Sequence, residues 1–204
     1  MIEVYYGAPS IYGRKVLAVL EEKSLDYRIL PVNFREADHK KEAYLKLNPN
    51  GEIPTIVDDG NAIYESTAII EYLDEEYPHP PLMPEDSFLR AKVRMIDDFC
   101  DLHLYPAIRA VVIKLRTKNE NPTDADREEI AGLLGRIETY LGDQSYLVDS
   151  FSLADCAFMP VIPSLEGLGL GDLLNVSKKL SGYSARLRLR PGYKGASLLK
   201  LETP

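Results

Sequence analysis

Two serines stand at the predicted starts of helices, where a hydroxyl and unpaired main-chain N–H groups together favour an anion. Ser10 follows an opening strand, and Ser66 heads a later helix directly after Glu65. A hydroxyl that donates to a charged acceptor contributes ~1.5–3 kcal/mol, and a helix N-terminus adds ~0.3–1 kcal/mol. Ser10 is therefore a candidate hydrogen-bond donor to an anion. Ser66 is a candidate for binding a carboxylate, and Glu65 is a candidate partner of an ammonium group. Each serine can also be explained as a plain helix cap.

The elements that must position these residues alternate between strand and helix in the first eighty residues. Short β-rich runs alternate with stretches of helical apolar periodicity, and Asp58-Asp59-Gly60-Asn61 is typical of a hairpin turn. The predicted strands cover residues 2–6, 27–32, 55–57 and 62–64, and the predicted helices cover residues 13–23 and 66–76. With a further helix before the third strand, the order is β-α-β-α-β-β-α.

A proline-rich segment divides the chain. Four prolines within residues 78–84 deny a helix and stiffen the backbone. Beyond it the strand signals end, and one long helix is predicted over residues 88–118. Thr123 caps a second helix that ends near Gly142, and a Ser-x-x-Asp cap at Ser152 starts a third. We expect a domain over residues 1–77, a linker over 78–87 and an all-helical domain over 88–204.

Four motifs in this order resemble those of the cytosolic glutathione transferases, especially the serine-type, phi-like or theta-like classes. The segment 8–16 resembles the turn after the first strand, with a serine that opens the first helix. The other three segments are 38–42 with its His-Lys pair, 48–55 with an Asn-Pro-x-Gly-x-Ile-Pro pattern, and 63–69 with Glu-Ser. Asn50 departs from the pattern, because phenylalanine is common at that position. The resemblance implies a thioredoxin-like α/β domain followed by an all-α domain.

The resemblance also implies a site for glutathione as co-substrate, activated as a thiolate for attack on an electrophilic small molecule. Ser10 would be the catalytic hydrogen-bond donor to the sulfur. Tyr5 or Tyr6 is the rival, because other classes use a tyrosine at the end of the first strand. Alternation along that strand puts the two tyrosines on opposite faces, so at least one is expected to pack in a core or interface. The implied cofactor-binding residues are His39, Lys40, Ile53, Pro54, Glu65 and Ser66.

The assignment of His39 and Lys40 has a physical alternative, and that of Ile53 depends on the form of one peptide bond. His39 and Lys40 can reach a glutathione carboxylate, but a Lys-rich helix is also typical of a plain solvated face. The resemblance implies a cis Pro54, which would leave the Ile53 main chain open to pair with the tripeptide as an added strand. For the hydrophobic electrophile we expect a pocket lined by Ile11, Tyr12, Tyr105 and Arg109.

The family resemblance leaves more than one activity open. A homodimer is expected, in which long helices pack about a two-fold axis. The alternatives to a transferase are a glutathione-dependent isomerase, dehalogenase or ether-cleaving enzyme, and a non-catalytic binding or regulatory protein on the same scaffold.

The composition of the chain limits the classes of partner that we expect. Asp and Glu number 32 against 24 Lys and Arg, a formal charge of −8 that argues against nucleic acid as a partner. The sequence lacks a long apolar run, so we expect no membrane span and a cytoplasmic protein. Two cysteines, Cys100 and Cys156, do not make a zinc site, and His79 and His103 lack spaced ligand partners, so no metal is expected.

Overall fold

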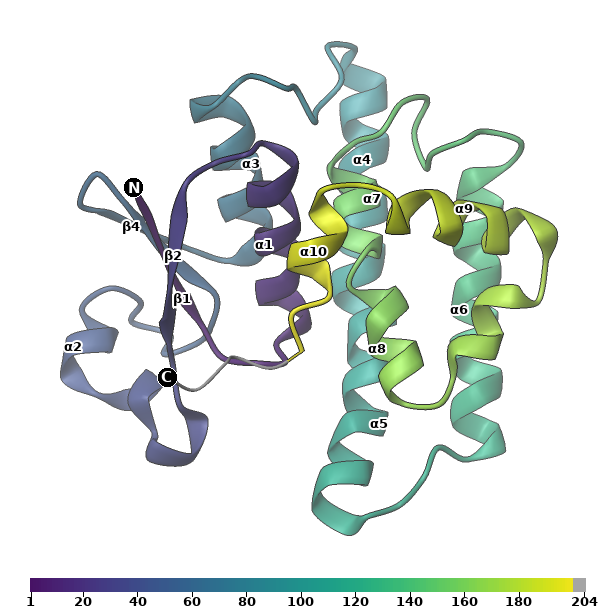
Figure 1. Ribbon diagram of the computed structural model, residues 1–204, viewed down its shortest axis with the longest axis horizontal. Helices are drawn as coiled ribbons and strands as arrows, with labels where there is room; N and C mark the ends of the chain where they lie inside the picture. Colours follow the sequence, from purple (N-terminus) through teal and green to yellow (C-terminus); the bar gives the residue numbers. More distant parts are fainter. Residues whose placement is uncertain (200–204) are drawn as a thin grey trace. The chain divides into compact units, whose positions relative to one another are not determined.

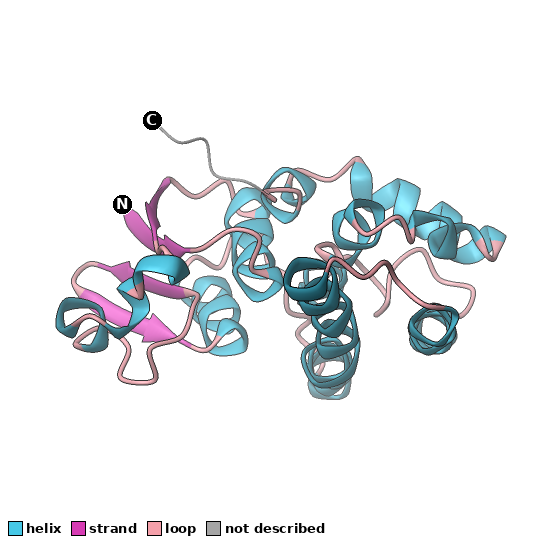
Figure 2. Cartoon of the chain, turned by 90° about the horizontal axis from the view of Figure 1, so that it is seen from below, coloured by secondary structure: helices cyan, strands magenta, loops and turns pink. Residues whose placement is uncertain are grey.

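The computed structural model describes residues 1–199, which form two compact units. The first unit contains residues 1–80 together with the segment from Pro191 on, and the second contains residues 81–190. All strands of the described chain belong to the first unit, and the second consists of helices and their connections (Figure 2). The predicted fold class, a thioredoxin-like α/β domain followed by an all-helical one, is confirmed.

The first unit is built on a mixed four-stranded sheet in the order β2-β1-β3-β4 (Figure 1). β1 runs parallel to β2 and antiparallel to β3, and β3 pairs with β4 as a hairpin. This sheet carries the predicted helices. The elements in chain order are β1 (Ile2–Tyr6), α1 (Ile11–Glu22), β2 (Tyr27–Pro31), α2 (Glu42–Leu45), β3 (Thr55–Asp58), β4 (Asn61–Tyr64), α3 (Ser66–Glu76) and, after the second unit, α10 (Gly192–Ala196).

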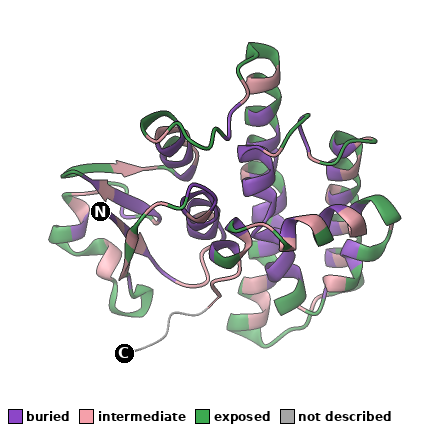
Figure 3. Ribbon diagram, turned by 45° about the horizontal axis from the view of Figure 1, so that its top comes forward, coloured by how far each residue is buried: buried purple, intermediate pink, exposed green. Residues whose placement is uncertain are grey.

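Alternation along β1 separates a core face from an outer face. Ile2, Val4 and Tyr6 are buried, whereas Glu3 and Tyr5 on the other face are half-buried. α1 packs on the core face and is buried along nearly its whole length (Figure 3).

The C-terminal segment packs on α1, and the observed units differ here from the predicted domain of residues 88–204. Gly192 and Gly195 permit this close approach, because a methyl group on Gly195 would lie 2.5 Å from the main chain of Leu17. The Gly192 N–H donates to the buried Glu22 Oε1 at 2.9 Å. Both glycines lack the side chain that would hold the two helices apart.

The second unit contains six α-helices within the described chain and confirms the predicted helix starts. Thr123 and Ser152 each form a capping box, with Asp126 and Asp155 respectively. Its helices are α4 (Ser87–Phe99), α5 (Tyr105–Lys118), α6 (Asp124–Leu141), α7 (Leu153–Phe158), α8 (Val161–Gly167) and α9 (Lys178–Arg188).

The long helix predicted over residues 88–118 is interrupted in pitch. A π-helical turn, Cys100–Leu104, joins α4 to α5. Pro106 lies in the first turn of α5 and has no N–H, so the α-helical bond to Leu102 cannot form. The wider turn accommodates this lost bond.

The buried carboxyl of Asp155 organises the start of α7. It accepts from the Ser152 N–H at 2.9 Å, from the Leu147 N–H at 3.0 Å and from the Tyr183 hydroxyl at 2.7 Å. Complete burial raises the pKa of Asp155 to about 6.

Across residues 1–199, none of the helices has the length and apolar character that a bilayer crossing requires.

Candidate functional site

Ser10 lies in the turn between β1 and α1 and is the N-cap of α1. Its Oγ accepts from the Gly13 N–H at 3.1 Å, and its own N–H donates to the Gly7 carbonyl at 2.9 Å. Within residues 1–199 the hydroxyl proton has no acceptor. A serine hydroxyl accepts through lone pairs and donates through its proton, so capping leaves the donor function available.

The two tyrosines of β1 are committed elsewhere. Tyr6 is fully buried on the core face and donates to the Leu198 carbonyl at 2.5 Å, and burial raises its pKa to about 12. Tyr5 lies on the outer face, edge-on to the ring of Tyr44 at 5.7 Å between centroids. Burial and the Glu3 carboxylate raise the pKa of Tyr5. The expected division of the pair between two faces is confirmed.

The loop before β3 is held by buried polar groups. The Asn48 amide donates to the Glu52 carbonyl at 2.9 Å and to Thr55 Oγ1 at 3.1 Å, and the hydroxyl of Tyr44 lies 2.9 Å from the same Thr55 oxygen. The Ile53-Pro54 peptide bond is cis, as the resemblance implied. The main-chain N–H and C=O of Ile53 form no hydrogen bond with any residue the structure describes.

Two glycines bring the predicted binding residues close together. A methyl group on Gly7 would lie 3.1 Å from Ile53 Cδ1 and from Phe34 Cε2. The Phe34 ring stacks on His39 at 4.3 Å between centroids. Gly51, in a left-handed conformation with φ +61°, lies against the main chain of His39, and Lys40 Nζ approaches its carbonyl at 3.5 Å.

His39 and Lys40 thus lie beside the loop that carries Ile53, rather than on an isolated exposed helix. Both belong to a short 3-10 turn, Asp38–Lys40. The Nδ1 atom of His39 is buried and has no hydrogen-bond partner among the described residues. The arrangement supplies one imidazole and one ammonium group near the Ile53 main chain.

Glu65 and Ser66 lie at the start of α3, with one difference from expectation. The N-cap position belongs to Glu65, whose backbone is left-handed with φ +68°, and Ser66 is the first helical residue. The Glu65 side chain does not cap the helix, because Asn50 Nδ2 donates to its Oε1 at 3.2 Å. Ser66 is buried at the helix start, where a hydroxyl and helix N–H groups favour a carboxylate.

The four residues expected to line an electrophile pocket differ in their surroundings. Ile11 is buried and Tyr12 half-buried at the start of α1, directly after Ser10. Arg109 is exposed on α5. Tyr105 is fully buried in the second unit and donates to the Ala157 carbonyl, so its assignment to a pocket wall is corrected to a core residue.

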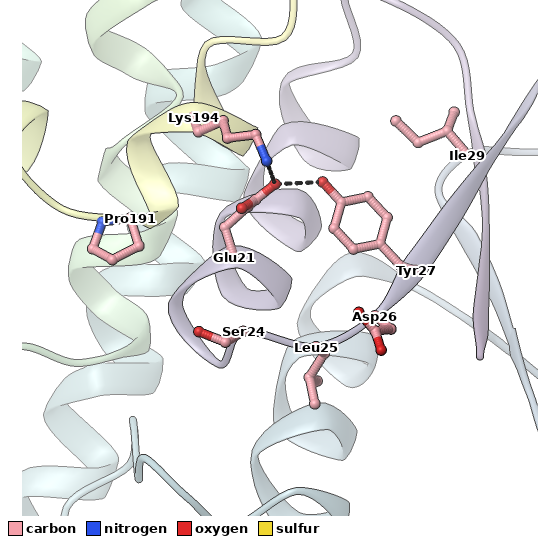
Figure 4. A pocket seen from close by; sticks show the side chains of 8 residues that line it. All are labelled: Glu21, Ser24, Leu25, Asp26, Tyr27, Ile29, Pro191 and Lys194. Atoms are coloured by element: carbon pink, nitrogen blue, oxygen red, sulfur yellow. Dashed lines mark hydrogen bonds and ion pairs between the residues drawn. The ribbon is translucent and has the colours of Figure 1, made fainter.

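An open pocket in the first unit lies at the other end of α1 from Ser10 (Figure 4). There Glu21 Oε1 accepts from the Tyr27 hydroxyl at 2.8 Å and lies 2.9 Å from Lys194 Nζ. The pocket contains none of the predicted site residues. Its lining residues are Glu21, Ser24, Leu25, Asp26, Tyr27, Ile29, Pro191 and Lys194.

No group of three or more potential metal ligands occurs within residues 1–199.

Sequence reasoning missed three contributors to the site. Phe34, which stacks on His39, is an exposed aromatic in a loop and carries no motif. Asn50 was noted only as a departure from the family pattern, although its amide holds Glu65. Arg14 is buried and donates to the Ala196 carbonyl at 3.0 Å, a contact that depends on a segment 182 residues away. Only Asn50 carried a signal that could have identified it.

Comparison with known proteins identifies the family. Residues 9–76 match the glutathione S-transferase N-terminal domain, and residues 89–191 match the glutathione S-transferase C-terminal domain. The chain belongs to the cytosolic glutathione transferase superfamily.

Relatives with different names match most or all of the chain. The stringent starvation protein A homolog of Coxiella burnetii is 31% identical over 100% of this chain and 94% of its own length. Maleylacetoacetate isomerase of Pseudomonas aeruginosa is 34% identical over 81% of each chain. The crystal structure of glutathione transferase F7 from Populus trichocarpa superposes with a TM-score of 0.83 at 26% identity, covering 97% of this chain and 98% of that one.

Proposed function

We propose that the protein is a glutathione transferase in which Ser10 donates a hydrogen bond to the glutathione sulfur. The thiolate attacks an electrophilic carbon, the new S–C bond forms, and the leaving group departs with its electron pair. The observation that carries this proposal is the Ser10 hydroxyl, whose oxygen accepts from Gly13 while its proton has no acceptor within residues 1–199. The start of α1 adds its N-terminal dipole to the same anion.

These two groups supply enough energy for thiol activation. A free thiol has a pKa of ~8.5, and lowering it by ~2 units takes about 2.7 kcal/mol of preferential anion stabilisation. A donor to a charged acceptor gives ~1.5–3 kcal/mol, and a helix N-terminus in a sheltered position gives up to ~2 kcal/mol. Ser10 needs no covalent role.

The remaining groups bind the rest of the tripeptide in this proposal. The Ile53 main chain pairs with it as an added strand, next to Pro54. His39 and Lys40 hold one carboxylate, Ser66 and the start of α3 hold the other, and Glu65 receives the ammonium group. Ile11 and Tyr12, which follow Ser10 at the start of α1, are the proposed contacts of a hydrophobic electrophile.

The test is the ultraviolet thiolate absorbance of bound glutathione against pH. Ser10→Ala removes the charge-assisted bond, so the pKa of the bound thiol is expected to rise by about 1–2 units. Turnover near neutral pH then falls roughly tenfold to a hundredfold. Tyr5→Phe is the control and is expected to leave the pKa unchanged. A rise for Tyr5→Phe with none for Ser10→Ala would assign thiol activation to the tyrosine instead.

Glutathione titration by calorimetry tests the binding step separately. We expect binding at micromolar to low millimolar concentration. No heat at several millimolar glutathione would reject the enzyme and favour a non-catalytic protein on this scaffold. Sedimentation of the same sample is expected to show a homodimer, twice the chain mass of 22.9 kDa. A cytoplasmic location completes the proposal.

A glutathione-dependent isomerase is the second candidate, because a relative named maleylacetoacetate isomerase is 34% identical over 81% of this chain. Isomerisation uses the same thiolate but returns glutathione unchanged after the substrate rearranges. Assays that follow glutathione consumption and cis-trans conversion in parallel separate the two activities. Conversion without consumption would favour the isomerase.

A further inference from the structure

Tyr6 connects the C-terminal segment to the start of α1. Its hydroxyl donates to the Leu198 carbonyl at 2.5 Å, and its side chain is fully buried. Its ring lies directly against Gly13, because a methyl group on Gly13 would be 2.5 Å from Tyr6 Cδ2 and 2.7 Å from Cε2. Only glycine leaves room for the ring at that position.

Gly13 is also the residue that holds the Ser10 side chain. Its N–H donates to Ser10 Oγ at 3.1 Å. Accepting this bond holds the Ser10 side chain in place and leaves its hydroxyl proton free to rotate toward an acceptor. Three consecutive contacts therefore join Leu198 to Tyr6, Tyr6 to Gly13 and Gly13 to Ser10.

We propose that Tyr6 is a positioning residue for Ser10, and that the C-terminal segment 191–199 anchors Tyr6 in that role. The proposal rests on the proposed function, in which Ser10 donates to the glutathione sulfur. Tyr6 acts through the packing of its ring on Gly13 and makes no contact with the sulfur itself.

The anchoring segment is firmly attached within the first unit. Arg14 Nη1 donates to the Ala196 carbonyl at 3.0 Å, and the Arg14 N–H donates to the Ser10 carbonyl at 3.0 Å. Gly192 and Gly195 pack against the main chain of α1. The segment thus contacts α1 along its length, and Tyr6 carries that contact to the turn before the helix.

The geometry also separates this role from direct thiol activation. The single hydroxyl proton of Tyr6 is already donated to Leu198. Burial opposes ionisation of the phenol, and the nearby Arg14 guanidinium offsets this only in part. A tyrosine in this state holds a main-chain carbonyl and has no second proton for a sulfur.

Tyr6→Phe tests the proposal, because it keeps the ring on Gly13 and removes the anchor to Leu198. The bound thiol pKa is expected to rise by about 0.5–1 unit, part of the ~1–2 units expected for Ser10→Ala. Neutral-pH kcat falls about threefold to tenfold, whereas the Kd of glutathione changes less than twofold. A purely structural tyrosine would change stability and leave the thiol pKa in place.

The matched control is Tyr72→Phe. The Tyr72 hydroxyl donates to Asp58 Oδ2 at 3.0 Å, so the same chemical change is made away from both Ser10 and the segment 191–199. The pKa of the thiol bound to this variant is expected to equal that of wild type. The double variant Ser10→Ala/Tyr6→Phe is expected to show the same pKa as Ser10→Ala alone, because a positioning residue has no effect once its target is removed.

Three results would contradict the proposed function or the proposed role of Tyr6. Wild-type protein without a depressed thiol pKa rejects the proposed function itself, before any variant is compared. A folded Tyr6→Phe with the wild-type pKa overturns the proposed anchoring of Tyr6 by the segment 191–199, because this variant removes only the bond to Leu198. Additive pKa rises in the double variant also overturn it, because Tyr6 would then act independently of Ser10. If Tyr6→Phe does not fold, Arg14→Lys loosens Ala196 instead, and an unchanged pKa there has the same meaning.

Discussion

Single residues in this site serve structure and chemistry together. Ser10 caps α1 through an oxygen lone pair, which does not use its proton, so the helix cap and the proposed hydrogen-bond donor are compatible interpretations. Glu65 is different, because its carboxylate is engaged by Asn50 rather than by the helix it precedes. Asn50, which departs from the family pattern, thus contacts Glu65, which agrees with that pattern.

Asn50→Ala is expected to weaken glutathione binding without changing the thiol pKa. Asn50 holds the Glu65 carboxylate in one orientation, and its loss removes about 0.5–1 kcal/mol of ordering, a twofold to fivefold rise in Kd. Calorimetry measures the change. Asn121→Ala, an exposed amide in the second unit, is the control. Tighter binding by Asn50→Ala would mean that the Asn50 amide competes with the ligand for Glu65.

At the scale of elements, the loop before β3 depends on a backbone that only glycine adopts easily. Gly51 has φ +61°, and an added methyl group would lie 2.7 Å from the His39 carbonyl oxygen and 2.9 Å from Lys40 Nζ. The loop and the 3-10 turn with His39 therefore fit together through the missing side chain. The positions of the loop and of the 3-10 turn therefore depend on this contact rather than on the secondary-structure propensity of either segment.

Gly51→Ala is expected to lower the free energy of unfolding by about 2–4 kcal/mol, from left-handed strain and the clash with His39 together. Gly60→Ala is the matched control, since Gly60 also has positive φ, at +83°, but no heavy atom lies within 4 Å of the added carbon. It should lose about 1–2 kcal/mol through strain alone. Urea unfolding measures both. Equal losses would show that the contact with His39 contributes nothing.

Elements with strong local signals were predictable, and those set by distant contacts were not. Ser152 and Thr123 start helices through capping boxes that are visible in the sequence. The π-helical turn before α5 was missed, although Pro106 removes a helical N–H, because the sequence does not show how a long helix absorbs the loss. Local chemistry sets helix starts, whereas tertiary packing decides the pitch between them.

At the scale of the whole molecule, the residues that local motifs indicated differ from those that depend on contacts between distant segments. The motif residues Ser10, Ile53 and Ser66 were singled out through the family resemblance, and they lie just before α1, just before β3 and at the start of α3 respectively. The packing of residues 191–199 on α1 was not predicted, because the sequence does not show which main chain Gly192 and Gly195 approach. Their contribution to Tyr6 appears only in the folded chain.

Thiol chemistry is distributed over the molecule in a way that supports one last prediction. The two cysteines of the chain, Cys100 and Cys156, are both fully buried in the second unit. Disulfide exchange needs a reachable thiolate, which the start of α1 does not provide because Ser10 stands there. The glutathione sulfur is therefore the only reactive thiol in the proposed reaction.

Replacing both cysteines by alanine is expected to leave kcat/KM for conjugation within about threefold of wild type, since neither thiol reaches the reacting atoms. Alanine is preferred to serine because a hydroxyl buried without a partner costs about 1–3 kcal/mol. The same double replacement combined with Ser10→Ala is expected to lose as much activity as Ser10→Ala alone. A loss beyond about tenfold in a folded double variant, judged by circular dichroism and glutathione affinity, would reveal a thiol that takes part in catalysis.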